Sequence, residues 1–398
     1  MRVAVIHDWL YVVGGAERVL ADILKCYPDA DVFTLFDALS PEGHRQIGLK
    51  TVKTSFLHKF PAISRLHRML LPLMPLAIEQ LDLSEYDLVI SSSYAVAKGV
   101  LTGPNQVHVA YVHSPMRYAW DLQHEYLRQS KMVWGLKSML ARLFLGRMRI
   151  WDVRTAHGPD AMLANSAFVA RRIQKIYGRK ATVLNPPVEI AAARADTPRG
   201  NYFFAASRLV PYKNIHLIVE AITKAPDLKL VVAGTGPEEA RLKAMAGPNV
   251  EFKGFVSDAE MRALMAGARA FIFAAEEDFG IVPVEAQAEG TPVIAFGRGG
   301  ALETVKSDVP GRTGMFFDTP TPEAILASVR RFIAEEAGFS REACRAQAER
   351  FSSERFRTEL QRLVGEEILR VSETYPGLAP SMLAYARTRN GSSAKVAE

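Results

Sequence analysis

Short apolar runs alternate with helical patterns along the chain, and this alternation restricts its fold more than any other feature. In the first half, apolar runs predict strands over residues 2–8, 31–36, 88–92, 107–113 and 161–165. In the second half, the predicted strands cover residues 202–206, 228–233, 250–253, 270–275, 292–296 and 315–317. Strands that alternate with helices are typical of parallel sheets covered on both faces. The pattern therefore predicts an α/β chain with two parallel-sheet domains.

Helix-start signals lie between the predicted strands of the second half. Pro237 and Pro322 each stand in a first helical turn, where the missing N–H of proline costs nothing. Ser257 and Glu260 form a capping-box pattern. Ligands of parallel sheets bind at the carboxyl ends of the strands, so we expect a central cleft between the two domains.

The segment Asn185-Pro186-Pro187 is the predicted domain boundary, because two prolines restrict the backbone and remove two hydrogen-bond donors. Residues 1–185 are expected to form an N-terminal domain, and residues 186–352 a second domain. A helical pattern continues over residues 353–389. Residues 390–398 are expected to be a disordered tail.

Composition places the chain among globular proteins. Its 398 residues are too many for one ordinary core, 48% are hydrophobic and 23% are charged. No apolar run reaches the roughly 18 residues of a membrane-spanning helix, and the N-terminus enters a predicted strand without a secretory segment. Cys26 and Cys344 lie far apart and outside any metal-ligand spacing, which predicts a cytoplasmic protein.

Positive charge is concentrated in the first half. Residues 1–185 hold 23 Lys and Arg against 15 Asp and Glu, a surplus of +8, whereas residues 186–398 hold 26 against 28. Residues 43–78 and 126–151 contain no acid and interleave basic with apolar side chains. Such stretches favour peripheral binding to an anionic membrane surface, at the inner face of the cytoplasmic membrane. Helices packed on a core with a solvated basic face are the alternative. No nucleic-acid recognition motif accompanies the charge, so we expect no nucleic-acid partner.

The strand predicted over residues 270–275 is followed by acidic residues and then by a glycine that begins a helix. Amides of Gly280, Ile281 and Val282 are expected to point toward an anion from the helix start. Glu277 and Glu285 flank this turn, and carboxylates accept hydrogen bonds from sugar hydroxyls. The pattern fits a phosphate beside hydroxyl-rich groups. A surface turn with acidic capping residues is the alternative.

The spacing of Glu277 and Glu285 resembles the signature of glycosyltransferase family 4, which comprises retaining nucleotide-sugar transferases of the GT-B fold. Further segments that match this family lie at residues 207–209, 212–214, 234–236, 290–294 and 299–303. The resemblance covers nearly the whole chain. It implies two Rossmann-like domains that face a central cleft, with the acceptor on the side of residues 1–185 and the nucleotide sugar bound by residues 186–352. It also implies that the helical segment 353–389 crosses back to the N-terminal domain.

Two cations follow the first strand of the second half. Arg208 and Lys213 flank a short loop at the carboxyl edge of that strand, where they suit the developing charge of a departing diphosphate. The family resemblance implies this role for both, and surface solubility is the alternative. Gly14 and Gly15 follow the first strand and permit close approach of a phosphate or sugar. They lack the third glycine of a dinucleotide fingerprint, which argues against an NAD-dependent oxidoreductase.

His113 ends the strand predicted over residues 107–113. The resemblance implies that this histidine lies near the sugar or phosphate of the donor, although a histidine satisfied by its neighbours is the alternative. Arg117 and Tyr118 follow it and are predicted acceptor contacts. The run of residues 113–121 is similar to bacterial mannosyltransferases of O-antigen and exopolysaccharide assembly.

The resemblance completes the predicted donor site with Ser207, Gly236 and Phe279. Phe255 and Val256 are the predicted contacts to the nucleotide base.

An acidic pair, Asp29 and Asp31, formally matches the Asp-x-Asp metal motif of another transferase class. It precedes a predicted strand, whereas a metal-binding pair is expected to follow one. Turn capping is therefore the interpretation we adopt, and we predict no metal and no other cofactor.

Together these features predict a retaining transferase that moves a hexose, mannose from GDP-mannose, to a lipid-linked glycan of a bacterial surface polysaccharide. His113, Arg208, Lys213 and Glu277 are its predicted catalytic residues. Two alternatives remain at this point. A nucleotide-sugar epimerase of the same fold needs no acceptor, and a non-catalytic sugar-nucleotide sensor binds without turnover.

Overall fold

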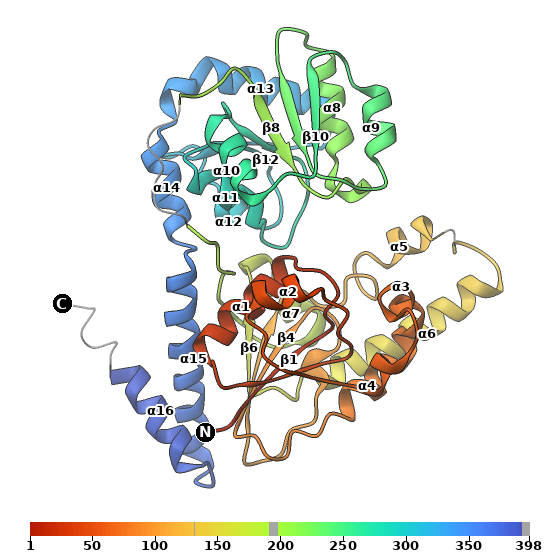
Figure 1. The fold of residues 1–398 in the computed structure, drawn as a ribbon, viewed down its shortest axis with the longest axis vertical. Helices are drawn as coiled ribbons and strands as arrows, with labels where there is room; N and C mark the ends of the chain where they lie inside the picture. Colours follow the sequence, from red (N-terminus) through yellow and green to blue (C-terminus); the bar gives the residue numbers. More distant parts are fainter. Residues whose placement is uncertain (131, 191–197, 392–398) are drawn as a thin grey trace. The chain divides into compact units, whose positions relative to one another are not determined.

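The computed structural model describes residues 1–130, 132–190 and 198–391, which form two compact units (Figure 1). Unit 1 contains residues 1–185 together with the described residues from Phe356 onward, and unit 2 contains the described residues from Pro186 to Arg355. Lys131, in the second basic stretch, lies outside the described residues. The tail predicted over residues 390–398 is wrong for Asn390 and Gly391, which end the last helix, and its remainder lies outside the described residues.

Unit 1 is built on a parallel sheet with the strand order β3-β2-β1-β4-β5-β6-β7. The strands are β1 (Val3–His7), β2 (Asp31–Thr34), β3 (Val52–Thr54), β4 (Leu88–Ser93), β5 (Val107–Val112), β6 (Ala161–Ala164) and β7 (Thr182–Val183). All five predicted strands are present. Strands β3 and β7 were not predicted, because these edge strands are short and are not fully buried.

Helices cover both faces of the first sheet. They are α1 (Gly15–Cys26), α2 (Pro41–Ile47), α3 (Ile63–Leu66), α4 (Met74–Glu79), α5 (Gln123–Gln129), α6 (Leu136–Thr155), α7 (Ala167–Tyr177), α15 (Ser353–Thr374) and α16 (Pro380–Gly391), with 3₁₀ turns η1 (Phe56–Lys59), η2 (His67–Leu73) and η3 (Ala97–Gly99). Alternate residues of β1 enter different cores, because side chains alternate across a strand. Val5 packs with α1 and α15, whereas Ile6 packs with α4 and α6. The C-terminal helices therefore belong to the core of unit 1, as predicted.

Unit 2 repeats this architecture with the strand order β10-β9-β8-β11-β12-β13. Its strands are β8 (Phe203–Ala206), β9 (Leu230–Ala233), β10 (Val250–Gly254), β11 (Phe271–Phe273), β12 (Val293–Phe296) and β13 (Gly314–Phe317). Its helices are α8 (Ile215–Thr223), α9 (Glu239–Met245), α10 (Asp258–Gly267), α11 (Ile281–Ala288), α12 (Ala301–Thr304), α13 (Pro322–Glu335) and α14 (Arg341–Glu349), with 3₁₀ turns η4 (Pro211–Lys213) and η5 (Glu336–Gly338). All six predicted strands are present. Helix α9 begins two residues after the predicted Pro237.

Each sheet has one point at which the direction of strand addition reverses. In unit 1 this point lies between β1 and β4, and in unit 2 between β8 and β11. Loops at the carboxyl ends of such strand pairs diverge to opposite faces and leave a place for a ligand. The loops after these four strands are therefore the first place to look for functional side chains.

Candidate functional site

The loops after β8 and β11 are joined by side chains at the reversal point of unit 2. Lys213, at the end of η4, forms an ion pair with Glu277 from the β11–α11 loop, and 15% and 20% of the two side chains stay exposed. Asn214, which has a left-handed φ of 56°, donates its side-chain amide to the carbonyl of Ala274 at 3.1 Å. The predicted cation and carboxylate therefore lie in direct contact.

Tyr212 connects the two predicted cations. A guanidinium nitrogen of Arg208 donates to the Tyr212 hydroxyl at 3.0 Å, and Nζ of Lys213 lies 5.3 Å from the centroid of the Tyr212 ring. The sequence analysis did not assign Tyr212 to the site, although an aromatic residue between two cations was an available signal. Arg208, Tyr212, Lys213 and Glu277 thus form one cluster, which we call the cation cluster.

Glycines behind this cluster are required for packing. A Cβ on Gly234 would lie 1.9 Å from the carbonyl oxygen of Ser207, and a Cβ on Gly236 would lie 2.3 Å from that of Leu209. The Ser207 hydroxyl donates to the carbonyl of Arg208 at 2.9 Å. Ser207 and Gly236, predicted donor contacts, therefore shape the loop that carries Arg208.

Helix α11 begins beside the cation cluster. Its N-cap, Gly280, has a φ of 88°, a conformation that favours glycine, and Ile281 and Val282 follow in the first turn. Glu285 lies one turn further along and is half-buried. The predicted order of strand, acidic residues, glycine and helix is confirmed in this segment.

Phe279 does not present its side chain to a ligand. Its ring is buried and packs edge to face on Phe351, with 5.3 Å between the centroids. Because the ring of Phe279 packs in the core, only the backbone of Phe279 is available to a donor.

The two predicted base contacts have different environments. Phe255 is 84% exposed, whereas Val256 is buried and packs in the core beneath α10. An exposed aromatic ring is able to stack on a base, so the prediction remains open for Phe255. The burial of Val256 removes its side chain from the candidate site.

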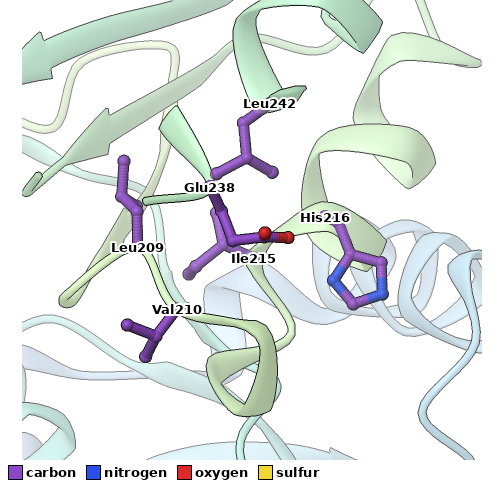
Figure 2. Close-up of a pocket in the computed structure, with 6 residues that line it drawn as sticks. All are labelled: Leu209, Val210, Ile215, His216, Glu238 and Leu242. Atoms are coloured by element: carbon purple, nitrogen blue, oxygen red, sulfur yellow. The ribbon is translucent and has the colours of Figure 1, made fainter. Parts of the chain in front are cut away.

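A shallow crevice with essentially no enclosed volume lies beside the Arg208–Lys213 loop (Figure 2). It is lined by Leu209, Val210, Ile215, His216, Glu238 and Leu242. Burial lowers the pKa of His216. Ligand pockets generally enclose about 300 Å³ or more. The crevice is thus too small for a nucleotide sugar.

The loops after β1 and β4 meet at the reversal point of unit 1. The buried carboxylate of Asp8 accepts hydrogen bonds from four successive backbone amides, those of residues 94–97, at 2.6–3.0 Å. Burial raises the pKa of Asp8, while the amide donors act in the opposite direction. Asp8 therefore fixes the loop that follows β4.

His113 follows β5 and contacts this reversal point. Its Nε2 lies 2.8 Å from the Ser92 hydroxyl, and the rings of Tyr94 and Tyr111 lie 6.0 and 5.1 Å away. Burial, with a smaller effect of His7, lowers the pKa of His113 to about 3. The imidazole is therefore uncharged near neutral pH.

The glycine turn after β1 leads directly into α1. Gly14 is the N-cap of α1, and its amide donates to the Glu17 carboxylate at 2.9 Å. This amide is consequently not available to a phosphate, and only Gly15 and the amides that follow remain candidates.

The predicted acceptor contacts lie in the segment between β5 and α5. Arg117 is half-buried there. The Tyr118 hydroxyl is buried and hydrogen-bonds to none of the described residues, and burial raises its pKa. Both residues are half-buried, and the Nε atom of Arg117 is buried like the Tyr118 hydroxyl.

The Asp-x-Asp motif has its own partners. Asp31 accepts hydrogen bonds from the Tyr86 hydroxyl at 2.5 Å and from Lys53 at 3.2 Å. Within the residues that the structure describes, no three His, Cys, Asp or Glu side chains gather in a group able to hold a metal ion.

The exposed side of α6 combines apolar and basic residues. Leu136, Leu140, Leu143 and Ile150 are each more than half exposed and recur at helical spacing, and Trp134 just before the helix is 90% exposed. Lys137, Arg142 and Arg147 are exposed on the same helix. We call this surface the α6 face. No helix of the described residues is sufficiently long and apolar to cross a membrane.

Comparison with known families decides the classification. The family described as Glycosyltransferase Family 4 matches residues 13–192, and the family described as Glycosyl transferases group 1 matches residues 189–351. The chain belongs to glycosyltransferase family 4. The resemblance seen in the sequence is thus confirmed.

Two curated relatives are similar to this family 4 chain over parts of their length. A D-inositol 3-phosphate glycosyltransferase from Nocardioides is 29% identical over 246 residues, covering 52% of this chain and 53% of the relative. A GDP-mannose-dependent phosphatidylinositol dimannoside mannosyltransferase from Mycobacterium tuberculosis is 28% identical over 222 residues, covering 51% and 57%. The chain thus spans about half the length of these relatives.

Solved structures confirm the GT-B fold. The Anabaena protein HepE in complex with UDP superposes with a TM-score of 0.66 at 20% identity, covering 92% of this chain and all of HepE. Sucrose-phosphate synthase from Thermosynechococcus elongatus gives a TM-score of 0.67 at 16% identity, covering 93% and 100%.

Proposed function

We propose that this family 4 protein is a retaining glycosyltransferase that moves mannose from GDP-mannose to a hydroxyl of a lipid-linked glycan. The observation that carries the proposal is the cation cluster, where Lys213 contacts Glu277 and Arg208 is connected through Tyr212. Cations beside a carboxylate suit a ligand that joins a diphosphate to a sugar. The named activity of the mycobacterial relative supports the choice of GDP-mannose.

In the proposed reaction, Arg208 and Lys213 stabilise the negative charge on the departing diphosphate. Glu277 exchanges its contact with Lys213 for hydroxyls of the transferred sugar, and Glu285 binds those of the ribose. Amides at the start of α11 assist the phosphate. The bond from the anomeric carbon to the phosphate oxygen breaks on the face where the bond to the acceptor oxygen forms. The acceptor proton passes to the leaving phosphate.

Donor choice is tested by calorimetry with GDP-mannose, UDP-glucose and ADP-glucose. We expect GDP-mannose to bind at least tenfold more tightly than the other two, equivalent to about 1.4 kcal/mol. Mass spectrometry of products formed with lipid extracts then tests transfer. Preference for UDP-glucose, the donor bound by HepE in a solved complex, would contradict the proposed donor and leave the transferase class intact. Conversion of the donor without any acceptor would instead favour an epimerase.

We also propose that the α6 face binds an anionic membrane surface, which would present a lipid-linked acceptor to unit 1. Exposed leucines and basic side chains on one helix fit an interfacial helix better than a core-facing one. Each basic residue near an anionic surface contributes about 1 kcal/mol. Arg117, between β5 and α5, is the proposed contact to the acceptor.

Flotation with vesicles of neutral and anionic phospholipid tests this surface. We expect salt-sensitive binding to the anionic vesicles. The double variant Leu140→Glu/Leu143→Glu should bind these vesicles at least tenfold more weakly, because it loses two apolar contacts with the membrane and its new carboxylates are repelled by the anionic lipid. The control is Leu302→Glu, an exposed leucine of unit 2. Equal binding to neutral and anionic vesicles would exclude the electrostatic part of the proposal.

A further inference from the structure

A chain of four polar side chains runs through the reversal point of unit 1. Glu17 Oε1 lies 3.4 Å from His7 Nε2, His7 Nδ1 lies 3.1 Å from the Ser92 hydroxyl, and this hydroxyl lies 2.8 Å from His113 Nε2. His7 and Ser92 are fully buried and pair in the register of β1 with β4. The ring of Tyr94 contacts both imidazoles, with centroids 5.7 and 6.0 Å away. We call these side chains the histidine chain.

The direction of every hydrogen bond in the histidine chain follows from its first member. A glutamate carboxylate can only accept hydrogen bonds, and Glu17 accepts the Gly14 amide at one oxygen and faces His7 with the other, so His7 carries its proton on Nε2. Nδ1 of His7 then accepts the single proton of Ser92. The Ser92 oxygen must in turn accept from His113, which places the His113 proton on Nε2 and leaves Nδ1 with a lone pair.

We infer that Glu17 is a positioning residue that sets, through His7 and Ser92, which ring nitrogen of His113 carries the proton. Nδ1 of His113 hydrogen-bonds to none of the described residues. Its lone pair therefore makes His113 a hydrogen-bond acceptor toward a ligand hydroxyl. The identification of that hydroxyl with the donor sugar rests on the proposed function, whereas the proton assignment does not.

A doubly protonated His7 would reverse this order, because it would donate to Ser92. Charged hydrogen bonds between nitrogen and a carboxylate are ordinarily about 2.7–2.9 Å long. The observed separation of 3.4 Å from Glu17 is longer than this range. The low pKa of His113 fits the same picture, since an uncharged ring has one donor and one acceptor.

Glu17→Gln is expected to invert the histidine chain. The Gly14 amide can only donate, so it holds the oxygen of the new side-chain amide, and the NH₂ group then faces His7. His7 must accept at Nε2 and donate from Nδ1 to Ser92. Ser92 donates to Nε2 of His113, and the His113 proton moves to Nδ1. A substitution three contacts away in the histidine chain thus exchanges an acceptor for a donor at the ligand side of His113.

Nitrogen-15 NMR of histidine-labelled full-length protein measures the two tautomers directly. His113→Gln and His7→Gln identify the signals among the nine histidines. We expect His113 to carry its proton on Nε2 in the unsubstituted protein and on Nδ1 in Glu17→Gln. In the Ser92→Ala background, the same Glu17→Gln change should leave His113 unaltered. Glu42→Gln, an exposed glutamate of unit 1, is the control and should shift neither imidazole.

Three outcomes would overturn the inference: a His113 proton on Nδ1 in the unsubstituted protein, a doubly protonated His7, or a His113 tautomer that is the same in Glu17→Gln as in the unsubstituted protein. A fall of roughly three- to tenfold in kcat/KM for Glu17→Gln, the effect of one altered hydrogen bond, is the expected consequence for transfer. If the protein transfers no sugar, the proposed function fails while the NMR result still decides the proton assignment.

Discussion

Lys213→Ala is expected to lower kcat about 100- to 1,000-fold, the usual cost of removing one preorganised group that stabilises developing charge. Lys213 lies where the loops after β8 and β11 meet, and it retains only 15% exposure. A cation in such a site acts with little screening by water. Steady-state kinetics with GDP-mannose and a lipid acceptor, together with circular dichroism of the variant, measure the loss and verify the fold.

Two further variants separate catalysis from structure. Lys213→Ala leaves the Glu277 carboxylate without its cation, but Glu277 remains partly exposed, so water is able to solvate it and the unit should fold. Lys224→Ala removes an exposed lysine of unit 2 that pairs with Glu220 and should leave kcat unchanged. Near-normal turnover of folded Lys213→Ala would remove the diphosphate role, and an equal loss in Lys224→Ala would show that the effect is not specific.

The sequence predicted the sheets well because buried parallel strands consist of continuous apolar runs. It also placed Arg208, Lys213 and Glu277 at one sheet edge, because their loops follow strands β8 and β11, which are neighbours. The direct contact of Lys213 with Glu277 was not predicted from the sequence. The predicted roles assign these residues to two parts of a ligand, whereas electrostatic attraction pairs them directly.

Two kinds of residue escaped prediction for physical reasons. Ser92 and His7 are 85 positions apart, and only the register of β1 against β4 brings them together, so no local pattern marks the histidine chain. Phe279 and Val256 were assigned to a ligand because they stand in functional loops. Burial is decided by long-range packing, here against Phe351 and the core beneath α10, and sequence position does not report it.

Both reversal points hold their loops by the same means. In unit 1 the Asp8 carboxylate receives four amides of the loop after β4, and in unit 2 the Asn214 amide donates to the loop after β11. A side chain from the loop after one strand thus satisfies backbone groups of its neighbour. Buried backbone groups that lacked these partners would each cost about 1–3 kcal/mol. The candidate residues are therefore carried by loops whose shape is fixed before any ligand arrives.

Gly234→Ala tests this dependence, and we expect it to lower the free energy of unfolding of unit 2 by about 2–5 kcal/mol. Its φ of 118° lies in the region that favours glycine, which costs an alanine about 1–2 kcal/mol. The new Cβ would also meet the Ser207 carbonyl at 1.9 Å, and relief of such overpacking costs about 1–3 kcal/mol more. Because Ser207 directly precedes Arg208, displacement of the Ser207 backbone should also displace the cation cluster, and donor binding should weaken.

Gly311→Ala is the matched control for Gly234→Ala, since its φ is 73° but no atom lies within 4 Å of the added Cβ. It should cost only the backbone term of about 1–2 kcal/mol. Hydrogen exchange by mass spectrometry should show faster exchange of peptides from β8 and β9 in Gly234→Ala alone. All four tryptophans lie in unit 1, so their fluorescence reports whether the effect stays within unit 2. Equal destabilisation by the two alanines would show that backbone strain, and not contact with Ser207, determines the cost.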